Sequence, residues 1–385
     1  MARPPKLVLG AVLARCPRGS AGHTCAVFNW ALSFRALGWD VFLVEHVSGS
    51  ECEPPEAPGL RSPQEEFFHA TAREFGFDGR ACLLVDGAAP ELDAFRAFAA
   101  DAELFLNYSG QWKRLDLLAP RTVKAYLDVD PAFTQLWVET CGSDMNLDGH
   151  DVFLTVGTNL NGRDALVPRV GRSWITLPPP VPAEAWRARC PGPVDAPAAG
   201  AWSTIGHWYG YNDLVWQGRT YGGKRETLLA LRELPRHVAP PVTMATDLER
   251  AWGDWDEFVA AGWRFESASR VCHDVPTYLG FIASSRGEIG IAKGGYVVSR
   301  GGWVSDRSLV YLSLGRPVLL QDTGWTAAIE PGPGLLPFRD ARDCAARIAE
   351  VEADFARHAA GARAFAGDRF SPRRVLEPML ARILR

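Results

Sequence analysis

The sequence lacks several features that mark large classes of protein. It contains no run of about 18 apolar residues, so we expect no membrane-spanning helix. Lys and Arg number 41 against 45 Asp and Glu, and the formal net charge is −4. Nucleic-acid-binding proteins usually present a basic face, so we expect no nucleic-acid partner. No internal repeat of about 20–50 residues is visible, which argues against a solenoid.

Cysteine pairs and dinucleotide motifs are also missing. The eight cysteines form no Cys-x-x-Cys pair, so neither a zinc ribbon nor a thiol-redox motif is indicated. Scattered single cysteines fit reduced core positions and a cytoplasmic location. The apolar start, residues 6–16, is similar to a short signal sequence. Arg15 stands where cleavage requires a small residue, so we expect a buried strand there. No Gly-x-Gly-x-x-Gly follows that strand, which disfavours a nicotinamide oxidoreductase.

What is present is typical of a globular α/β protein. The 385 residues are 47% hydrophobic and 22% charged, and this length favours two domains. The N-terminal part predicts a strand at 7–13, a helix at 24–37 and a strand at 41–44. This β-loop-α-β unit is Rossmann-like. Apolar runs at 202–205 and 242–245 begin the same alternation again.

Proline-rich stretches indicate where one domain gives way to the next. Proline is concentrated at 178–182 and 191–197, and such segments are stiff connectors. We therefore predict an α/β fold of two Rossmann-like domains that face a cleft, at 1–180 and 200–370. Residues 371–385 place apolar side chains on one helical face, which predicts a C-terminal helix that could pack across the domains.

The most informative stretch is 293–325. Its glycine pairs at 294–295 and 301–302 let the backbone approach a ligand closely, because no Cβ stands in the way. Ser305 and Asp306 are typical residues for a helix start, and a helix N-terminus with free N–H groups binds anions. Three basic residues surround it. We therefore predict donor diphosphate contacts from Lys293, Arg300, Ser305, Asp306 and Arg307.

A second group of polar residues follows one strand later. Asp322 and Thr323 come directly after the apolar run 318–320, at the carboxyl end of a strand, where ligands bind in open α/β sheets. A carboxylate can accept hydrogen bonds from two sugar hydroxyls, and charge-assisted bonds are strong. We predict that both residues hold a sugar, with a plain capping turn as the alternative. A diphosphate site beside a sugar site indicates a nucleotide-sugar.

This segment resembles the donor-binding motif of the GT-B glycosyltransferases. Residues 300–305 (RGGWVS) match the start of the pattern of antibiotic-pathway and plant-type members. Residues 315–317 (GRP) match its middle, and 321–322 (QD) lie where its D-Q pair falls. The segment is also similar to a bacterial branch with the pattern K-x-G-Y-V, then S-D-R-S, G-R-P-V and Q-D-T-G. The resemblance implies two Rossmann-like domains and sugar transfer from a nucleotide-diphosphate donor.

The sequence departs from the family pattern at two positions. Arg300 replaces the histidine that touches the donor diphosphate, and its forked guanidinium can still bind phosphate. Ser308 stands where the family has the glutamate that holds the ribose, so Ser308 is our candidate for the ribose contact. The resemblance further places Lys224, in a loop before a helix, at the donor phosphates. It places His273 near the nucleobase.

Two residues near the N-terminal strands are candidates for catalysis. His23 follows the first strand, and the resemblance implies that it is the base that takes the acceptor proton. A histidine titrates near neutral pH, which suits that role. A loop histidine that caps the helix is the alternative. Asp128 and Asp130 could form a metal-binding DxD site, orient His23 or hold the acceptor, or start a helix. We expect no metal, because the diphosphate site makes one unnecessary.

These features together predict a metal-independent glycosyltransferase that needs no cofactor. It would move a sugar from a nucleotide-diphosphate sugar to a small-molecule acceptor, with inversion if His23 is the base; Asp130 is the alternative base or an orienting group. The Arg-rich, Lys-poor composition hints at a high-GC bacterium and at natural-product biosynthesis. The alternatives are a GT-B-fold nucleotide-sugar epimerase, which needs no acceptor, and a non-catalytic nucleotide-sugar-binding protein. The oligomeric state is left open.

Overall fold

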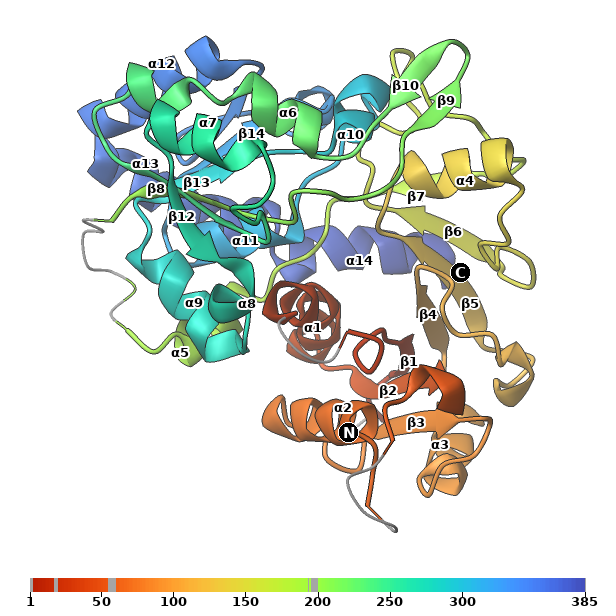
Figure 1. The fold of residues 1–385 in the computed structure, drawn as a ribbon. Helices are drawn as coiled ribbons and strands as arrows, with labels where there is room; N and C mark the ends of the chain where they lie inside the picture. Colours follow the sequence, from red (N-terminus) through yellow and green to blue (C-terminus); the bar gives the residue numbers. More distant parts are fainter. Residues whose placement is uncertain (1–2, 17–19, 55–59, 193, 195–199, 385) are drawn as a thin grey trace.

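The computed structural model describes residues 3–16, 20–54, 60–192, 194 and 200–384 (Figure 1). Its first feature is a parallel sheet of seven strands in the order β3-β2-β1-β4-β5-β6-β7. Every neighbouring pair runs parallel. The strands are β1 (Lys6–Gly10), β2 (Asp40–Val47), β3 (Ala81–Val85), β4 (Leu104–Tyr108), β5 (Val123–Asp128), β6 (Val152–Thr155) and β7 (Trp174–Thr176).

The second feature is a parallel sheet of six strands in the order β12-β11-β8-β13-β14-β15. Numbered from its own first strand, this order is the same 3-2-1-4-5-6 that the first six strands of the other sheet follow, which is the Rossmann order. The strands are β8 (Trp202–Ile205), β11 (Val242–Thr246), β12 (Arg264–Ser267), β13 (Gly287–Gly290), β14 (Val318–Gln321) and β15 (Leu335–Phe338).

Helices connect the strands and cover the sheets. A small antiparallel hairpin, β9 (Leu214–Trp216) and β10 (Arg219–Tyr221), projects beside them. The helices are α1 (Ala21–Ala36), α2 (Pro63–Glu74), α3 (Leu92–Ala99), α4 (Phe133–Cys141), α5 (Ala183–Arg189), α6 (Arg225–Ala230), α7 (Asp254–Ala261), α8 (Ala268–Val271), α9 (Val275–Ser284), α10 (Gly294–Ser299), α11 (Asp306–Ser313), α12 (Ala341–Ala353), α13 (Phe355–Ala364) and α14 (Pro372–Ile383).

Helix α1 lies between the two sheets (Figure 1). It is apolar all round, and every side chain from Thr24 to Phe34 is buried, as expected of a helix covered on all sides. It packs against α9, α11 and α14. Its buried Asn29 accepts a hydrogen bond from the indole N–H of Trp186, 2.7 Å away, so the amide oxygen is satisfied within the core. The packing of α1 fixes where its first turn, and with it His23, stands.

Helix α14 also lies between the two sheets (Figure 1). Ser371 caps it, Pro372 opens it, and its buried apolar face includes Leu376 and Met379. The predicted helix at 371–385 is therefore present, with residue 385 outside the described residues. No helix in the described ranges is long and apolar enough to cross a bilayer.

The predicted fold class, α/β with two Rossmann-like sheets, is confirmed. All strands of the first sheet lie between residues 6 and 176, and all strands of the second between 202 and 338. The domain limits 1–180, 200–370 and 371–385 stay a prediction. Most of the proline-rich stretch 191–197 lies outside the described residues. In each sheet the strand order reverses beside the first strand, at β1/β4 and at β8/β13, and ligands bind at the carboxyl side of such points.

Candidate functional site

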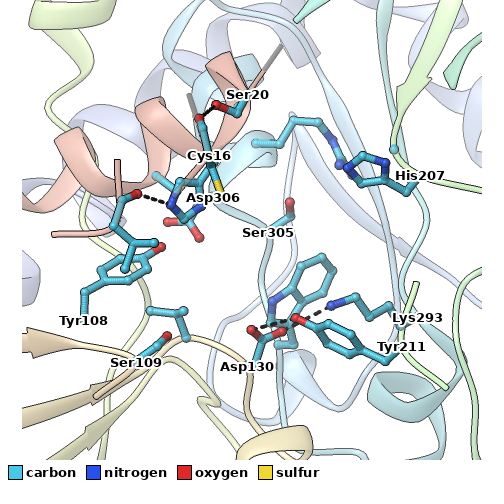
Figure 2. Close-up of a pocket in the computed structure, with 18 of the residues that line it drawn as sticks. Cys16, Ser20, Tyr108, Ser109, Asp130, His207, Tyr211, Lys293, Ser305 and Asp306 are labelled. Carbon is cyan, nitrogen blue, oxygen red and sulfur yellow. Dashed lines mark hydrogen bonds and ion pairs between the residues drawn. The ribbon is translucent and has the colours of Figure 1, made fainter. Parts of the chain in front are cut away.

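A cavity of about 740 Å³ opens at the carboxyl ends of both sheets. The loops after β1, β4 and β5 form one side, and the loops after β8 and β13 form the other, together with the first turn of α11. Figure 2 shows Asp130, Tyr211 and Lys293 grouped together, with Tyr108 and Ser109 apart from them. The cavity brings together six of the predicted site residues. These are His23, Asp130, Lys293, Ser305, Asp306 and Arg307.

His23 stands in the first turn of α1 and lines the cavity. Its Nε2 is 2.5 Å from the carbonyl oxygen of Val12, and its ring meets the edge of Tyr108. Burial lowers the pKa of His23, and the Val12 carbonyl and the charge of Asp130 offset this only in part. The imidazole is therefore neutral at pH 7. Because Nε2–H donates to Val12, the lone pair is on Nδ1, which has no hydrogen-bond partner in the described chain.

Asp130 joins the two sides of the cavity. It follows β5, and its carboxylate accepts hydrogen bonds from Tyr211 Oη at 3.0 Å, from Lys293 Nζ at 3.2 Å and from Tyr296 Oη. Burial alone would raise the pKa of Asp130, but the Lys293 ammonium and these bonds hold it below its usual value. The Lys293 ammonium also lies 3.5 Å from the centre of the Tyr211 ring. Asp130 is thus an ionised group with each oxygen engaged.

The other acid of the Asp-Val-Asp motif faces away from the cavity. Asp128 is fully buried and accepts bonds from Thr134 Oγ1, Gln135 Nε2 and Thr155 Oγ1, at 2.7, 3.0 and 2.7 Å. Burial raises the pKa of Asp128 to about 6, although these bonds oppose the rise. Asp128 and Asp130 therefore serve different neighbours, and the carboxylate of Asp128 organises the start of α4. The expectation of a metal-free site stays a prediction.

The first turn of α11 supplies the most polar corner of the cavity. Ser305 is its N-cap and its side chain makes no capping bond, so it leaves the N–H groups of the first turn for another acceptor. Arg307 Nε donates to the buried Glu288 at 2.6 Å, while its Nη2 and the second oxygen of Glu288 are buried without a partner. Burial raises the pKa of Asp306 to about 7. The corner combines helix N–H groups, a guanidinium and an acid that keeps its proton near neutrality.

Lys224 lies just behind the cavity wall. It precedes α6, and its ammonium touches the place that a Cβ on Gly206 would occupy. Gly206 follows β8 and lines the cavity, so the absence of a Cβ there lets the flexible end of Lys224 lie directly behind the wall. Burial and then the positive charges of Arg307 and Lys293 put the pKa of Lys224 well below its ordinary value. A negative charge in the cavity would oppose this lowering and favour the ammonium form of Lys224.

The remaining predicted residues do not line this cavity. Arg300 Nε pairs with Asp164 at 2.7 Å, and His273 is exposed beside Asp274. Asp322 accepts bonds from the Gly324 amide and the Thr326 hydroxyl, as in the capping-turn alternative. Thr323 is buried and donates to the Trp303 carbonyl, and Ser308 is fully buried with an unpartnered hydroxyl. Their assigned roles stay predictions.

Two residues that sequence reasoning passed over shape the site. Tyr296 binds Asp130, and only its place three residues after Lys293, one helical turn on, could have indicated a shared face. Glu45 is buried in β2 and accepts the backbone N–H groups of Leu13 and Ala14 at 2.6 and 2.8 Å. It thereby holds the loop whose Val12 carbonyl binds His23. The sequence signal for Glu45 was an acidic residue directly after the apolar residues 41–44 of the predicted strand.

Comparison with solved structures finds the same arrangement of elements along the whole chain. An alpha-glucosyltransferase in complex with UDP-glucose and DNA containing an abasic site is similar over 99% of this chain and 99% of its own, with 11% identity and a TM-score of 0.63. Anabaena Alr3699/HepE in complex with UDP and glucose is similar over 98% of this chain and 99% of its own, with 10% identity and a TM-score of 0.53.

A third similar structure is AviGT4, a glycosyltransferase involved in avilamycin A biosynthesis. It matches over 99% of this chain and 98% of its own, with 14% identity and a TM-score of 0.52. This chain has the GT-B fold. No protein-family model matches the sequence, and a comparison with curated proteins found no match. At these identities the likeness establishes the fold, and the site has to be argued from its own residues.

The same comparison corrects one sequence-based expectation. A net charge of −4 had led us to exclude a nucleic-acid partner, but a protein with this fold over its whole length is seen in complex with a 13-mer DNA. The exclusion was wrong because the net charge is a sum over the whole protein, whereas nucleic acid is bound by a local patch of positive charge. The partner class therefore cannot be read from the charge balance of this GT-B chain.

Proposed function

We propose that this chain is a glycosyltransferase that moves a sugar from a nucleotide-diphosphate sugar to an acceptor hydroxyl. One observation carries the proposal. A single cavity at the carboxyl ends of two Rossmann-like sheets has a neutral histidine on one side and a helix N-terminus with a guanidinium on the other. The histidine can take a proton from an acceptor hydroxyl, and the helix N-terminus with its guanidinium can bind an anionic leaving group. The similar structures hold UDP-glucose or UDP with glucose, which supports the proposal.

On the donor side, the diphosphate would lie at the first turn of α11. The N–H groups after Ser305 and the unpartnered Nη2 of Arg307 would donate to its oxygens. Lys293 and, behind Gly206, Lys224 would supply further positive charge. These groups are fixed by packing before the donor arrives, so they stabilise the developing charge without reorganising. In this proposal these groups neutralise the diphosphate charge without a metal ion. Arg300 could join it only after leaving Asp164.

On the acceptor side, Nδ1 of His23 would remove the proton of the attacking hydroxyl. As the new bond to the sugar carbon forms, the bond from that carbon to the diphosphate oxygen breaks, and the electron pair leaves with the diphosphate. Attack from the face opposite the leaving group inverts the carbon. We favour His23 over Asp130 as the base because the pKa of Asp130 is held low and its oxygens are already engaged. Asp130 would instead position Lys293.

We further propose that the acceptor is a small molecule bound where the loops after β1 and β4 meet α4. Arg15 and Gln111 line that part and already bind each other at 2.9 Å, so an acceptor hydroxyl would join an existing hydrogen-bonded pair, while Trp137 and Met145 offer apolar surface. This mix suits a hydroxylated compound with an apolar body. The link of AviGT4 to avilamycin biosynthesis is consistent with such an acceptor. A DNA acceptor, which one similar protein binds, is tested beside it.

The test begins with donor binding measured by calorimetry. UDP-, TDP- and GDP-sugars are titrated in the presence of a chelator, and at least one should bind. Lys293→Met should weaken that binding by about tenfold, the effect of one charge-assisted bond. Lys124→Met is the matched control, because Lys124 lies near the start of β5, at the opposite edge of the sheet. Equal loss in both variants, or no binding of any donor, would contradict the proposal.

The second step measures transfer with the donor that binds. His23→Gln keeps an N–H donor for the Val12 carbonyl but has no basic nitrogen, so it should bind donor normally and lose transfer by about 100-fold or more. The configuration of the new glycosidic bond, read by NMR, should be inverted. Donor conversion without an acceptor would indicate an epimerase, and binding without any turnover would indicate a non-catalytic protein. A preference for DNA over small hydroxylated acceptors would overturn the acceptor assignment alone.

A further inference from the structure

A second hollow, of about 450 Å³, lies where the chain passes from one sheet to the other and returns. Its walls are the end of β7 and the segment after it, the turn at Ala328 and Ile329, and the first three turns of α14. The two crossing segments are joined by a 2.7 Å hydrogen bond from the Val181 amide to the Phe370 carbonyl. This hollow shares no lining residue with the cavity described above.

The charge around this hollow is of one sign. Arg369, Arg374 and Arg382 line it, and no Asp or Glu does. Within the described chain, none of these three guanidiniums has a recorded ion pair or side-chain hydrogen bond. On the same helix, by contrast, Arg373 faces away and pairs with Glu377. In a chain with a net charge of −4, three unpaired guanidiniums at one hollow are a local concentration of positive charge.

The floor between these charges is apolar. Ile175 and Leu177 come from the first crossing, Ile329 from the turn before β15, and Phe370 and Met379 from the return crossing. Phe370 is fully buried and Met379 is almost so. Ile175 and Pro178 are only half-buried and Ala328 is exposed, so apolar surface remains in contact with water, and an inorganic anion would leave it so. A molecule with both an anionic head and a hydrocarbon part would satisfy both halves of the hollow.

We propose that this hollow is a binding site for an amphipathic anion, a phosphate monoester with a hydrocarbon chain. Guanidiniums match phosphate oxygens through paired N–H groups, which favours phosphate over a halide or other point charge. The volume lies within the range of small-molecule sites. The head group would bridge Arg374 and Arg382, and the chain would lie on the apolar lining that is still exposed, at Ile175, Pro178 and Ala328. The proposal does not depend on glycosyl transfer.

The test uses decyl phosphate, below the concentration at which it aggregates, titrated into the full chain by calorimetry. It should bind more tightly than inorganic phosphate and than decyl maltoside, each by about tenfold or more, because each control lacks one half of the ligand. The double variant Arg374→Ser/Arg382→Ser should lose about tenfold or more in affinity for decyl phosphate. Arg373→Ser, on the outward face of the same helix, should bind as the parent does.

A vesicle arm identifies the source of the ligand. If flotation with phosphatidylcholine vesicles requires added phosphatidic acid and is lost in the double variant, the head group belongs to a membrane lipid. If only decyl phosphate binds, the ligand is a free amphiphile. Equal affinity for inorganic phosphate would show an adventitious ion only and would overturn the proposal. Binding that survives in the double variant, or a stronger response to a 13-mer DNA, would overturn it as well.

Discussion

Replacement of Asp306 by asparagine tests the electrostatics of the cavity without reference to any substrate. Asp306 opens α11, and burial raises its pKa from 3.8 to about 7, with only part of the rise offset by the Asn29 amide. One of its oxygens is buried without a partner. Asparagine has the same shape but cannot ionise. The variant therefore removes the cost of a buried charge and little else.

The sign of the effect follows from proton binding. Between about pH 4 and about pH 7 the folded protein keeps a proton on Asp306 that the unfolded chain has released, so the stability of the wild type falls as pH rises. The difference between 3.8 and about 7 is worth up to about 4 kcal/mol at about 1.4 kcal/mol per pH unit. Glu45 and Asp128, whose pKa values burial raises to about 7 and about 6, add to the fall in the same direction.

The measurement is urea unfolding of wild type and Asp306→Asn at steps between about pH 5 and about pH 8. The free energy of unfolding of the variant should increase relative to that of the wild type as pH rises, and the difference should become constant above about pH 7. Asp164→Asn is the control: Asp164 is half exposed, and the bonds from Asn159 and Arg300 lower its pKa, so its loss should cost less than about 1 kcal/mol. Parallel stability curves for Asp306→Asn and wild type would refute the reasoning.

Two further substitutions probe the walls of the cavity. Asp130→Asn leaves Lys293 without its charged partner, so urea unfolding should show a loss of about 1–3 kcal/mol. Calorimetry should show tighter UDP binding, and unchanged values for both would contradict the role given to this pair. Gly206→Ala places a methyl group against the flexible end of Lys224, so it should cost less than about 1 kcal/mol of stability yet weaken UDP binding. Gly253→Ala, where nothing lies within 4 Å, is its control and should change neither.

The fold could be predicted because its signals are local. Apolar runs such as 7–13 and 202–205 and the helical spacing at 24–37 identify strands and helices from a few consecutive residues. Alternation of strand and helix then predicts parallel sheets. In a parallel sheet the loops that follow the strands all lie at the carboxyl edge, so the polar residues in them are expected there. For this reason His23, just after the first strand, and Lys293, just after a strand of the second sheet, could be expected at one cleft from sequence alone.

The contacts within the site could not be predicted in the same way. Arg300 was matched to a motif position, but its partner, Asp164, is 136 residues away in the sequence. Asp130 and Lys293 are separated by 163 residues and meet only because the two sheets face each other. A motif shows which functional groups a segment contains. Which groups already satisfy one another depends on packing between distant segments, and that decides which groups remain for a ligand.

The pairing of Lys293 with Asp130 shapes how an anionic donor would enter. Asp130 follows a strand of the first sheet, and Lys293 follows a strand of the second, so their ion pair ties the two walls of the cavity together. A diphosphate beside Arg307 would compete with Asp130 for the same ammonium. Because the pair is already half-buried, the exchange replaces one desolvated partner with another and costs little fresh desolvation. In this GT-B chain, donor binding would thus be coupled to the contact between the two sheets, through one lysine that serves both.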